Sequence, residues 1–166
     1  YVFTIILIIA IWLLTIMASI GFDFEKFIFF FNIPSLIVVV VVPFAGGLAN
    51  YTIREMGTFF GAGFRAETQL SGKSLDEART VYEKGIAFFH SLQQYVLISG
   101  FIGTLMGTIV MLSNLEDPSK LGRGMALALM TILYALLLIL LIILPFKNGL
   151  KRRLIESGHT DGRSQQ

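Results

Sequence analysis

Two threonines, Thr104 and Thr131, place hydroxyl groups inside long apolar segments of the chain. A threonine hydroxyl can donate and accept hydrogen bonds, and polar groups of this kind line ion paths through membranes. Thr104 lies in the stretch from Ile98 to Leu112, ISGFIGTLMGTIVML, which also contains three glycines. Glycine buries little surface and disfavours a helix, so its presence in such a segment requires a reason.

Small residues accompany both threonines at helical spacing. In the first segment the small and hydroxyl residues occur at i, i+3, i+4, i+7 and i+8, on one face of a helix: Gly100, Gly103, Thr104, Gly107 and Thr108. In the second they occur at i, i+4, i+7 and i+11: Gly124, Ala128, Thr131 and Ala135. Each helix therefore presents one narrow face of small residues.

The two threonines are also expected at similar depths. Thr104 precedes the predicted helix end at Leu112 by eight residues, and Thr131 follows the predicted start at Gly124 by seven. Both hydroxyls then lie about 10 to 12 Å below the outer surface. Two interpretations stay open: the faces only let helices pack closely, or they line a central space filled by another helix, with an ion path beside the threonines.

The composition indicates a membrane protein. Of 166 residues, 55% are hydrophobic and 14% are charged, with a mean hydropathy of +0.76, whereas roughly a quarter of residues are charged in soluble domains. Four apolar runs are long enough to cross a hydrocarbon core of about 30 Å: about Val2 to Ile20, Phe27 to Ala49, Tyr95 to Leu112 and Gly124 to Phe146. We predict an all-α membrane protein with four transmembrane helices. The first run lacks a preceding basic region, so we expect a span rather than a signal peptide.

None of these four segments contains Asp, Glu, Lys, Arg or His. Ionisable residues within a membrane are the usual mark of a proton relay, so the chain alone has no group there that could accept and release a proton. The two histidines, His90 and His159, have no ligand partners at helical spacing, and there are no cysteines. We therefore expect no enzymatic activity, no catalytic residue, no metal site, no cofactor and no nucleic-acid partner.

Basic residues are distributed unevenly among the loops. The two predicted outer loops contain three of them, namely Lys26, Lys120 and Arg123. The middle loop and the tail contain ten: Arg54, Arg65, Lys73, Arg79, Lys84, Lys147, Lys151, Arg152, Arg153 and Arg163. The positive-inside rule then places both termini and the middle loop in the cytoplasm.

The chain divides into four predicted segments. Residues 1–49 contain the first two transmembrane helices, 50–94 form a short cytoplasmic helical region, 95–146 contain the third and fourth helices as a channel-like core, and 147–166 form a cytoplasmic tail. The part of the tail that follows Lys151 is expected to be disordered.

The cytoplasmic region should be helical at both ends. The segment MGTFFGAGF is expected to continue the second helix. Ser74 as N-cap and Glu77 three residues into the helix form a capping box, and no breaker except Gly85 follows until Asn114. One helix from about Leu75 to Leu112 is therefore predicted, extending some 30 Å into the cytoplasm.

From about Gly100 to Lys151 the sequence resembles the MotA/TolQ/ExbB proton-channel family, and its MotA branch in particular. The segment GFIGTLMGTIVMLSNLEDPSKLGRGMALALMTILYALLLILLIILPFKNGLK is similar to the MotA pattern of G-x-IGTL-x-G, an LxNL-x-DP loop, G-x-x-MA-x-AL-x-T-x-LY and a closing proline. Pro34-Ser35 is also similar to the Pro-Ser that opens the second MotA span.

This resemblance implies a stator subunit of an ion-driven rotary motor in the bacterial inner membrane. Five copies would enclose a dimer of MotB/ExbD-like single-span partners, each with a membrane aspartate that carries a proton or sodium ion. The resemblance assigns pore-facing roles to Thr104 and Thr131, matches Tyr134 to the family's fourth-span tyrosine, and matches Pro145 to a fourth-span proline that acts as a helix hinge. Gly103, Gly107, Ala128 and Ala135 complete the candidate lining.

The sequence departs from the MotA pattern at three places. Leu97 replaces a third-span proline, Ile132 replaces the second threonine of a Thr-Thr pair, and the middle loop is much shorter than the MotA domain that meets the flagellar rotor. A reduced motor that serves the cell envelope, like the ExbB and TolQ energisers, is therefore an alternative to flagellar torque. A structural scaffold with four spans is the alternative from another class.

Overall fold

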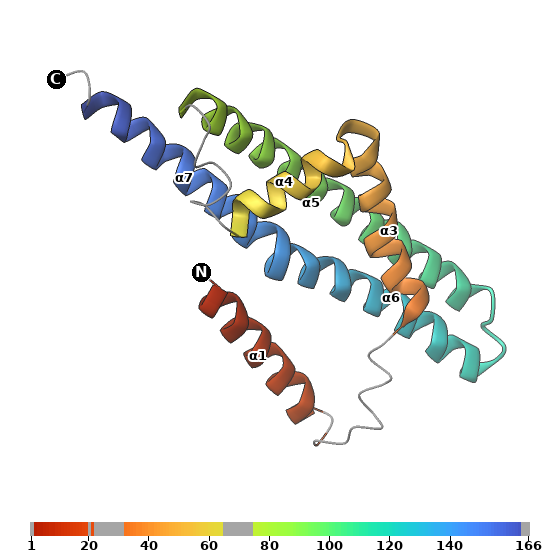
Figure 1. The fold of residues 1–166 in the computed structure, drawn as a ribbon. Coiled ribbons are helices and arrows are strands. Elements are labelled where there is room, and N and C mark those ends of the chain that lie inside the picture. The colour runs from red at the N-terminus through yellow and green to blue at the C-terminus, as the bar shows by residue number, and fades with distance from the viewer. Residues whose placement is uncertain (1, 20, 22–31, 65–74, 164–166) are drawn as a thin grey trace.

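The computed structural model describes residues 2–19, 21, 32–64 and 75–163, and every regular element in these ranges is a helix (Figure 1). The elements are α1 (Val2–Ser19), α3 (Ile33–Asn50), α4 (Ile53–Phe64), α5 (Leu75–Leu112), α6 (Pro118–Leu138), the π-helix η2 (Ile139–Ile143) and α7 (Leu144–Arg163). The predicted all-α class is confirmed for these residues.

Three helical stretches in the described part of the chain are long and apolar enough to cross a membrane. They are Ile33–Asn50, Asp76–Leu112 and Pro118–Ser157, and Ile9–Ser19 within α1 is a shorter apolar stretch. A fourth span formed by α1 therefore stays a prediction.

Helix α5 begins and ends where the sequence predicts. It runs for 38 residues, with Asp76 and Glu77 in its first turn, where negative charge favours the helix dipole. The proposed N-cap, Ser74, lies outside the described residues. At 1.5 Å per residue α5 is about 57 Å long, so it exceeds a hydrocarbon core of about 30 Å.

The glycine face of α5 packs directly against the small-residue face of α6. A methyl group added at Gly100 would lie 2.6 Å from Cβ of Ala135, and one added at Gly107 would lie 2.5 Å from the backbone nitrogen of Ala128. One added at Gly103 would overlap the methyl group of Thr131. The two helices therefore approach as an antiparallel pair at a distance that only residues without large side chains permit.

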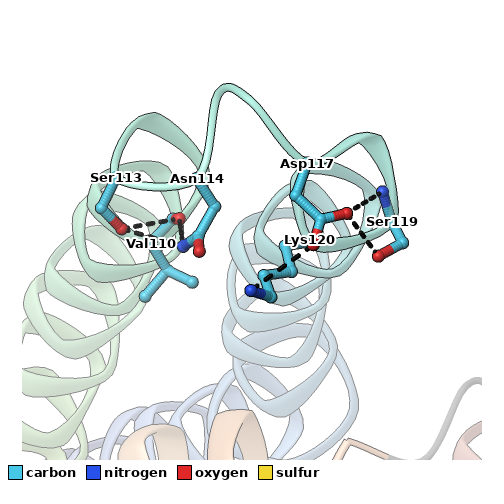
Figure 2. A network of polar contacts seen from close by, with 6 residues as sticks. All are labelled: Val110, Ser113, Asn114, Asp117, Ser119 and Lys120. Carbon is cyan, nitrogen blue, oxygen red and sulfur yellow. Dashed lines mark hydrogen bonds and ion pairs between the residues drawn. The ribbon is translucent and has the colours of Figure 1, made fainter.

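Side chains in the turn between α5 and α6 form hydrogen bonds with backbone groups at both helix ends (Figure 2). At the end of α5, Ser113 and Asn114 donate side-chain hydrogen bonds to the carbonyl of Val110, at 3.0 and 2.8 Å. At the start of α6, the Asp117 carboxylate accepts from the backbone N–H and the hydroxyl of Ser119, at 3.1 and 2.7 Å. The hydrogen bond from the Ser119 hydroxyl is the main reason that the pKa of Asp117 lies below its ordinary value.

This capping shortens the outer loop that the predicted spans, ending at about Leu112 and beginning at about Gly124, leave between them. Asp117 is the N-cap and Pro118 is the first residue of α6, so the helix begins six residues before Gly124. Asp at an N-cap followed by Pro is a strong helix-start signal. The Asp117-Pro118 pair of the LxNL-x-DP loop therefore starts a helix.

Helix α3 begins at a cap within the bundle. Asn32 is the N-cap, and its side chain accepts from the backbone N–H of Ser35 at 3.3 Å. The first part of the predicted second span, residues 27–31, lies outside the described residues. The helix continues through Pro43, which is buried, and ends at Asn50.

The segment MGTFFGAGF does not continue α3, contrary to the prediction. Tyr51 is extended, with φ −136° and ψ 142°, and it interrupts the helix. The backbone N–H of Thr52 then donates to the Glu55 carboxylate at 2.9 Å, which is half of a capping box for α4. The Thr-x-x-Glu spacing in the sequence was the overlooked signal for this second helix start.

An aromatic cluster joins α4 to α5 and α7. Neighbouring rings in it have centroids 5.1 to 6.1 Å apart, mostly edge to face. Its members are Tyr51, Phe59, Phe60, Phe88, Phe89 and Phe146. These contacts bury the aromatic side chains of α4 against α5 and α7.

Helices α6 and α7 follow one another through η2 without a break (Figure 1). The expectation of a disordered tail after Lys151 is wrong as far as Arg163, where α7 ends. Leu150 is fully buried and Leu154 packs against the same core, so apolar side chains on one face hold the helix to the bundle. On the exposed face of α7, an i, i+4 ion pair between Arg152 and Glu156, at 3.0 Å, further stabilises the helix.

The α5–α6 contact gives a stability prediction for Gly107→Ala. Its new methyl group would meet the backbone of Ala128, which cannot rotate away, so the helices must separate. We expect a loss of about 1–3 kcal/mol in the free energy of unfolding, measured by denaturant titration of the purified protein in detergent. Gly122→Ala is the matched control, because nothing lies within 4 Å of its new methyl group. The control should be neutral or stabilising by up to about 1 kcal/mol, and equal losses in the two variants would contradict the prediction.

Candidate functional site

Thr131 is part of a buried cluster of three oxygen atoms on α3 and α6. Its hydroxyl donates to the backbone carbonyl of Leu127 at 2.7 Å and lies 2.9 Å from the hydroxyl oxygen of Ser35. Ser35 in turn lies within 3.4 Å of the same carbonyl. Ser35 and Thr131 are each 1% exposed. The cluster therefore ties the first turn of α3 to the middle of α6.

Thr104 lies on α5 at the contact with α6, and it is only partly buried. Its hydroxyl donates to the carbonyl of Gly100, one turn earlier, at 2.9 Å, and lies 3.3 Å from the carbonyl of Ala128 on α6. A side chain on one helix thus reaches a backbone acceptor on the next. Thr108 bonds only within α5, to the carbonyl of Thr104 at 2.9 Å.

Tyr134 holds the start of α3. Its hydroxyl oxygen accepts a hydrogen bond from the backbone N–H of Asn32 at 2.9 Å. The first N–H groups of a helix have no partner within the helix, and inside a membrane such groups must find protein partners. Tyr134 and Thr131 are three residues apart, so both contact α3 from the same face of α6.

The structure brings most of the predicted site residues together at the α5–α6 contact. Gly103 and Gly107 on α5 face Thr131 and Ala128 on α6, and Ala135 lies against Gly100. In the single chain these small residues serve close helix packing, which was one of the two interpretations of the pattern. Their role in lining an ion path stays a prediction.

Pro145 lies apart from this contact, directly after η2. Proline lacks an N–H and its ring collides with the carbonyl four residues earlier in a regular helix. A π-helical turn provides the additional residue that accommodates this collision. The backbone N–H of Leu144 donates to the carbonyl of Ile139, five residues earlier, as a π-helix requires. A hinge at Pro145 stays a prediction. The structure adds that a wider, π-helical turn precedes this proline.

Two polar residues that contact Tyr134 and Thr131 were not among the predicted site residues. Asn32 and Ser35 both precede the valine-rich part of α3, and the sequence indicated only that Pro34-Ser35 resembles a Pro-Ser pair that opens a span. Their spacing, Asn-x-x-Ser, is suited to an N-cap that accepts from the third helical residue. Their contact with Thr131 and Tyr134, about a hundred residues later, could not be found from local spacing.

Polar contacts at the other end of the bundle hold α7 to α4 and α5. The ammonium group of Lys147 donates to the side-chain carbonyl of Gln93 at 3.2 Å, and the guanidinium group of Arg153 donates to the carbonyl of Ala62. Within the described residues no three acidic, histidine or cysteine side chains are grouped to hold a metal. No buried side-chain nitrogen or oxygen there lacks a hydrogen-bond partner.

Comparison with known proteins gives matches over much of the chain. The pattern of the MotA/TolQ/ExbB proton channel family matches residues 57–159. Motility protein A of Aquifex aeolicus is 40% identical over 88 residues, which are 53% of this chain and 34% of that protein. Chemotaxis protein PomA of Vibrio alginolyticus is 29% identical over 146 residues, which are 78% of this chain and 57% of that protein. The matched region thus covers about a third to just over half of these curated relatives.

The contact of Tyr134 with α3 gives a second stability prediction. Tyr134→Phe keeps the ring but removes the acceptor of the Asn32 N–H, and an unpaired buried donor costs about 1–3 kcal/mol. We expect a lower free energy of unfolding and faster hydrogen exchange at Asn32. Tyr95→Phe is the matched control, because the Tyr95 hydroxyl accepts from the exposed side chain of Asn50 at the opposite end of α3. If Tyr95→Phe destabilises the protein as much as Tyr134→Phe does, the inferred capping role is wrong.

Proposed function

The chain belongs to the MotA/TolQ/ExbB proton channel family, and we propose that it is a MotA-like, non-enzymatic subunit of an ion-driven rotary motor. Such a motor uses the flow of protons or sodium ions across a membrane to produce mechanical work. Ions would pass beside Thr104 and Thr131 and an aspartate on a partner helix.

The observation that supports this proposal is that the apolar segments contain threonine hydroxyls but no side chain that is charged at neutral pH. The four apolar segments contain no Asp, Glu, Lys, Arg or His, yet each of the paired helices α5 and α6 carries a threonine hydroxyl at their contact. Thr131 packs against Gly103, and the Thr104 hydroxyl lies 3.3 Å from the carbonyl of Ala128. Hydroxyls can help to solvate an ion that moves past them but cannot carry a proton charge themselves at neutral pH. We therefore expect the group that carries the ion to lie on a partner chain.

The proposed assembly supplies that group. Five copies of this chain would enclose a dimer of MotB/ExbD-like single-span partners in the bacterial inner membrane. Helix α1 would form a fourth span, and both termini would lie in the cytoplasm. The N-terminal half of α5, with α4 and the second half of α7, would extend into the cytoplasm and form the region that meets the load.

The two threonines differ in how they could meet an ion. Thr104 is partly exposed at the edge of the α5–α6 contact, whereas Thr131 is 1% exposed in the single chain. A path beside Thr131 therefore requires the packing around it to rearrange when the partner helix is bound. Separate substitutions can distinguish the two residues.

Two other functions are favoured by specific observations. The direct packing of the two small-residue faces favours a structural scaffold, because that contact needs no ion path to explain it. The short segment between α3 and α5 favours an envelope energiser of the ExbB/TolQ kind over flagellar torque. Light scattering of the complex formed with the single-span partner would separate the first of these from the motor, since a scaffold requires no fixed pentamer.

The central test of the proposal is ion flux through the complex in proteoliposomes. Thr104→Val and Thr131→Val each replace a hydroxyl by a methyl group of similar size, and we expect each to lower flux of protons or sodium ions about tenfold, with unchanged assembly. This corresponds to about 1.4 kcal/mol, within the range for one lost polar contact. Thr15→Val is the control, because the Thr15 hydroxyl is exposed and, among the described residues, bonds to the carbonyl of Ile11 within α1. Unchanged flux in both Thr104→Val and Thr131→Val would exclude the assigned path.

A further inference from the structure

Ser35 lies at a position from which it can control the orientation of Thr131. It is 1% exposed, and its hydroxyl oxygen is 2.9 Å from that of Thr131 and 3.4 Å from the carbonyl of Leu127. It is the residue on α3 whose side chain contacts the Thr131 hydroxyl in the described part of the chain. Because this contact joins two helices, it is additional to the hydrogen bond that the Thr131 hydroxyl makes within α6.

Ser35 gives the Thr131 hydroxyl a hydrogen-bond partner on another helix. Each hydroxyl has one proton to donate and two lone pairs that accept. The Thr131 hydroxyl proton lies within reach of two acceptors, the carbonyl of Leu127 at 2.7 Å and the hydroxyl of Ser35 at 2.9 Å. The Ser35 hydroxyl donates to the same carbonyl at 3.4 Å. Threonine in a helix divides between two side-chain rotamers, because its hydroxyl can bond the carbonyl three or four residues earlier. A hydroxyl fixed on α3 beside the Thr131 hydroxyl stabilises one of these rotamers.

The first turn of α3 is itself held in place at this level. Asn32 accepts from the backbone N–H of Ser35 at 3.3 Å, and the backbone N–H of Asn32 donates to the Tyr134 hydroxyl at 2.9 Å. Two contacts to α6, three residues apart, therefore fix the position of Ser35 relative to Thr131.

The opposite side of Thr131 is occupied by α5. A methyl group at Gly103 would overlap the Thr131 methyl, which therefore fills the space left by that glycine. Thr131 is thus oriented from two sides: its methyl group lies against α5 and its hydroxyl against α3. Replacing Gly103 would disturb the packing, whereas replacing Ser35 removes only the polar half of this arrangement.

We propose that Ser35 is a positioning residue for Thr131: it holds the Thr131 hydroxyl in one rotamer and so sets how that hydroxyl meets the ion path. This inference rests on the proposed function of Thr131. The simpler alternative is that Ser35 only packs α3 against α6. The two differ in whether the effect of Ser35 depends on the Thr131 hydroxyl.

The test is a double-substitution cycle on the complex with its single-span partner, reconstituted in proteoliposomes. Proton flux is followed with a pH-sensitive dye, and sodium flux in a parallel arm with a sodium-sensitive dye. Ser35→Ala should lower the flux of the conducted ion roughly fivefold, the size expected for one lost hydrogen bond. In a Thr131→Val background the same change should lower flux less than about twofold, because no hydroxyl is left to position.

Two further variants control for packing. Ser99→Ala removes another serine that is 1% exposed, but its hydroxyl bonds only within α5, to Val96 at 3.0 Å, so flux should stay within about twofold of the unmodified protein. The exchange Ser35→Thr with Thr131→Ser keeps both hydroxyls and the total number of atoms. It should recover most of the flux lost in Ser35→Ala.

The outcomes separate the two proposals. If Thr131→Val lowers flux but Ser35→Ala behaves like Ser99→Ala, or is equally harmful in the Thr131→Val background, positioning by Ser35 is overturned and the proposed function stands. If Thr131→Val leaves flux unchanged while Thr104→Val lowers it, positioning is overturned and the path excludes Thr131. If neither threonine affects flux, the ion path itself is overturned.

Discussion

The close approach of α5 and α6 is the contact on which the rest of the bundle depends. Lipid chains are as apolar as leucine, so helices in a membrane gain little from hiding aliphatic surface and associate through close packing and hydrogen bonds. The glycines at 100, 103 and 107 allow α6 to come within contact distance along about two turns of α5. At that distance the Thr104 hydroxyl reaches the carbonyl of Ala128, and the Thr131 methyl fills the space at Gly103.

Helix α3 attaches to this pair through polar groups rather than through small residues. Its first turn bonds to Thr131 and Tyr134, and at its other end Asn50 donates to Tyr95 on α5. A helix start at membrane depth exposes N–H groups that lipid cannot satisfy, so the same hydrogen bonds that fix the helix also remove that cost. The Thr131 hydroxyl is therefore in direct contact with the first turn of α3, whereas Thr104 bonds to α5 and α6.

The far end of the bundle is held by different forces. Aromatic rings from α4, α5 and α7 pack edge to face, and the side chains of Lys147 and Arg153 bond to α5 and α4. The π-helical turn before Pro145 lies between this end and the α5–α6 contact. The buried side chains of Ile139 and Ile143 in this turn belong to the same core, so they join the two packed regions.

The sequence by itself determined the helical class, the bounds of α5 and the matching small faces, because these follow from composition, capping and spacing along one segment. It left open what the small faces contact, and it missed the helix break at Tyr51 and the helical tail up to Arg163. Those features, like the contact of Ser35 with Thr131 across 96 positions, arise between distant segments. Only the tertiary structure decided them, since a hydrogen bond or a packed methyl group depends on where another helix lies, and local spacing carries no record of that.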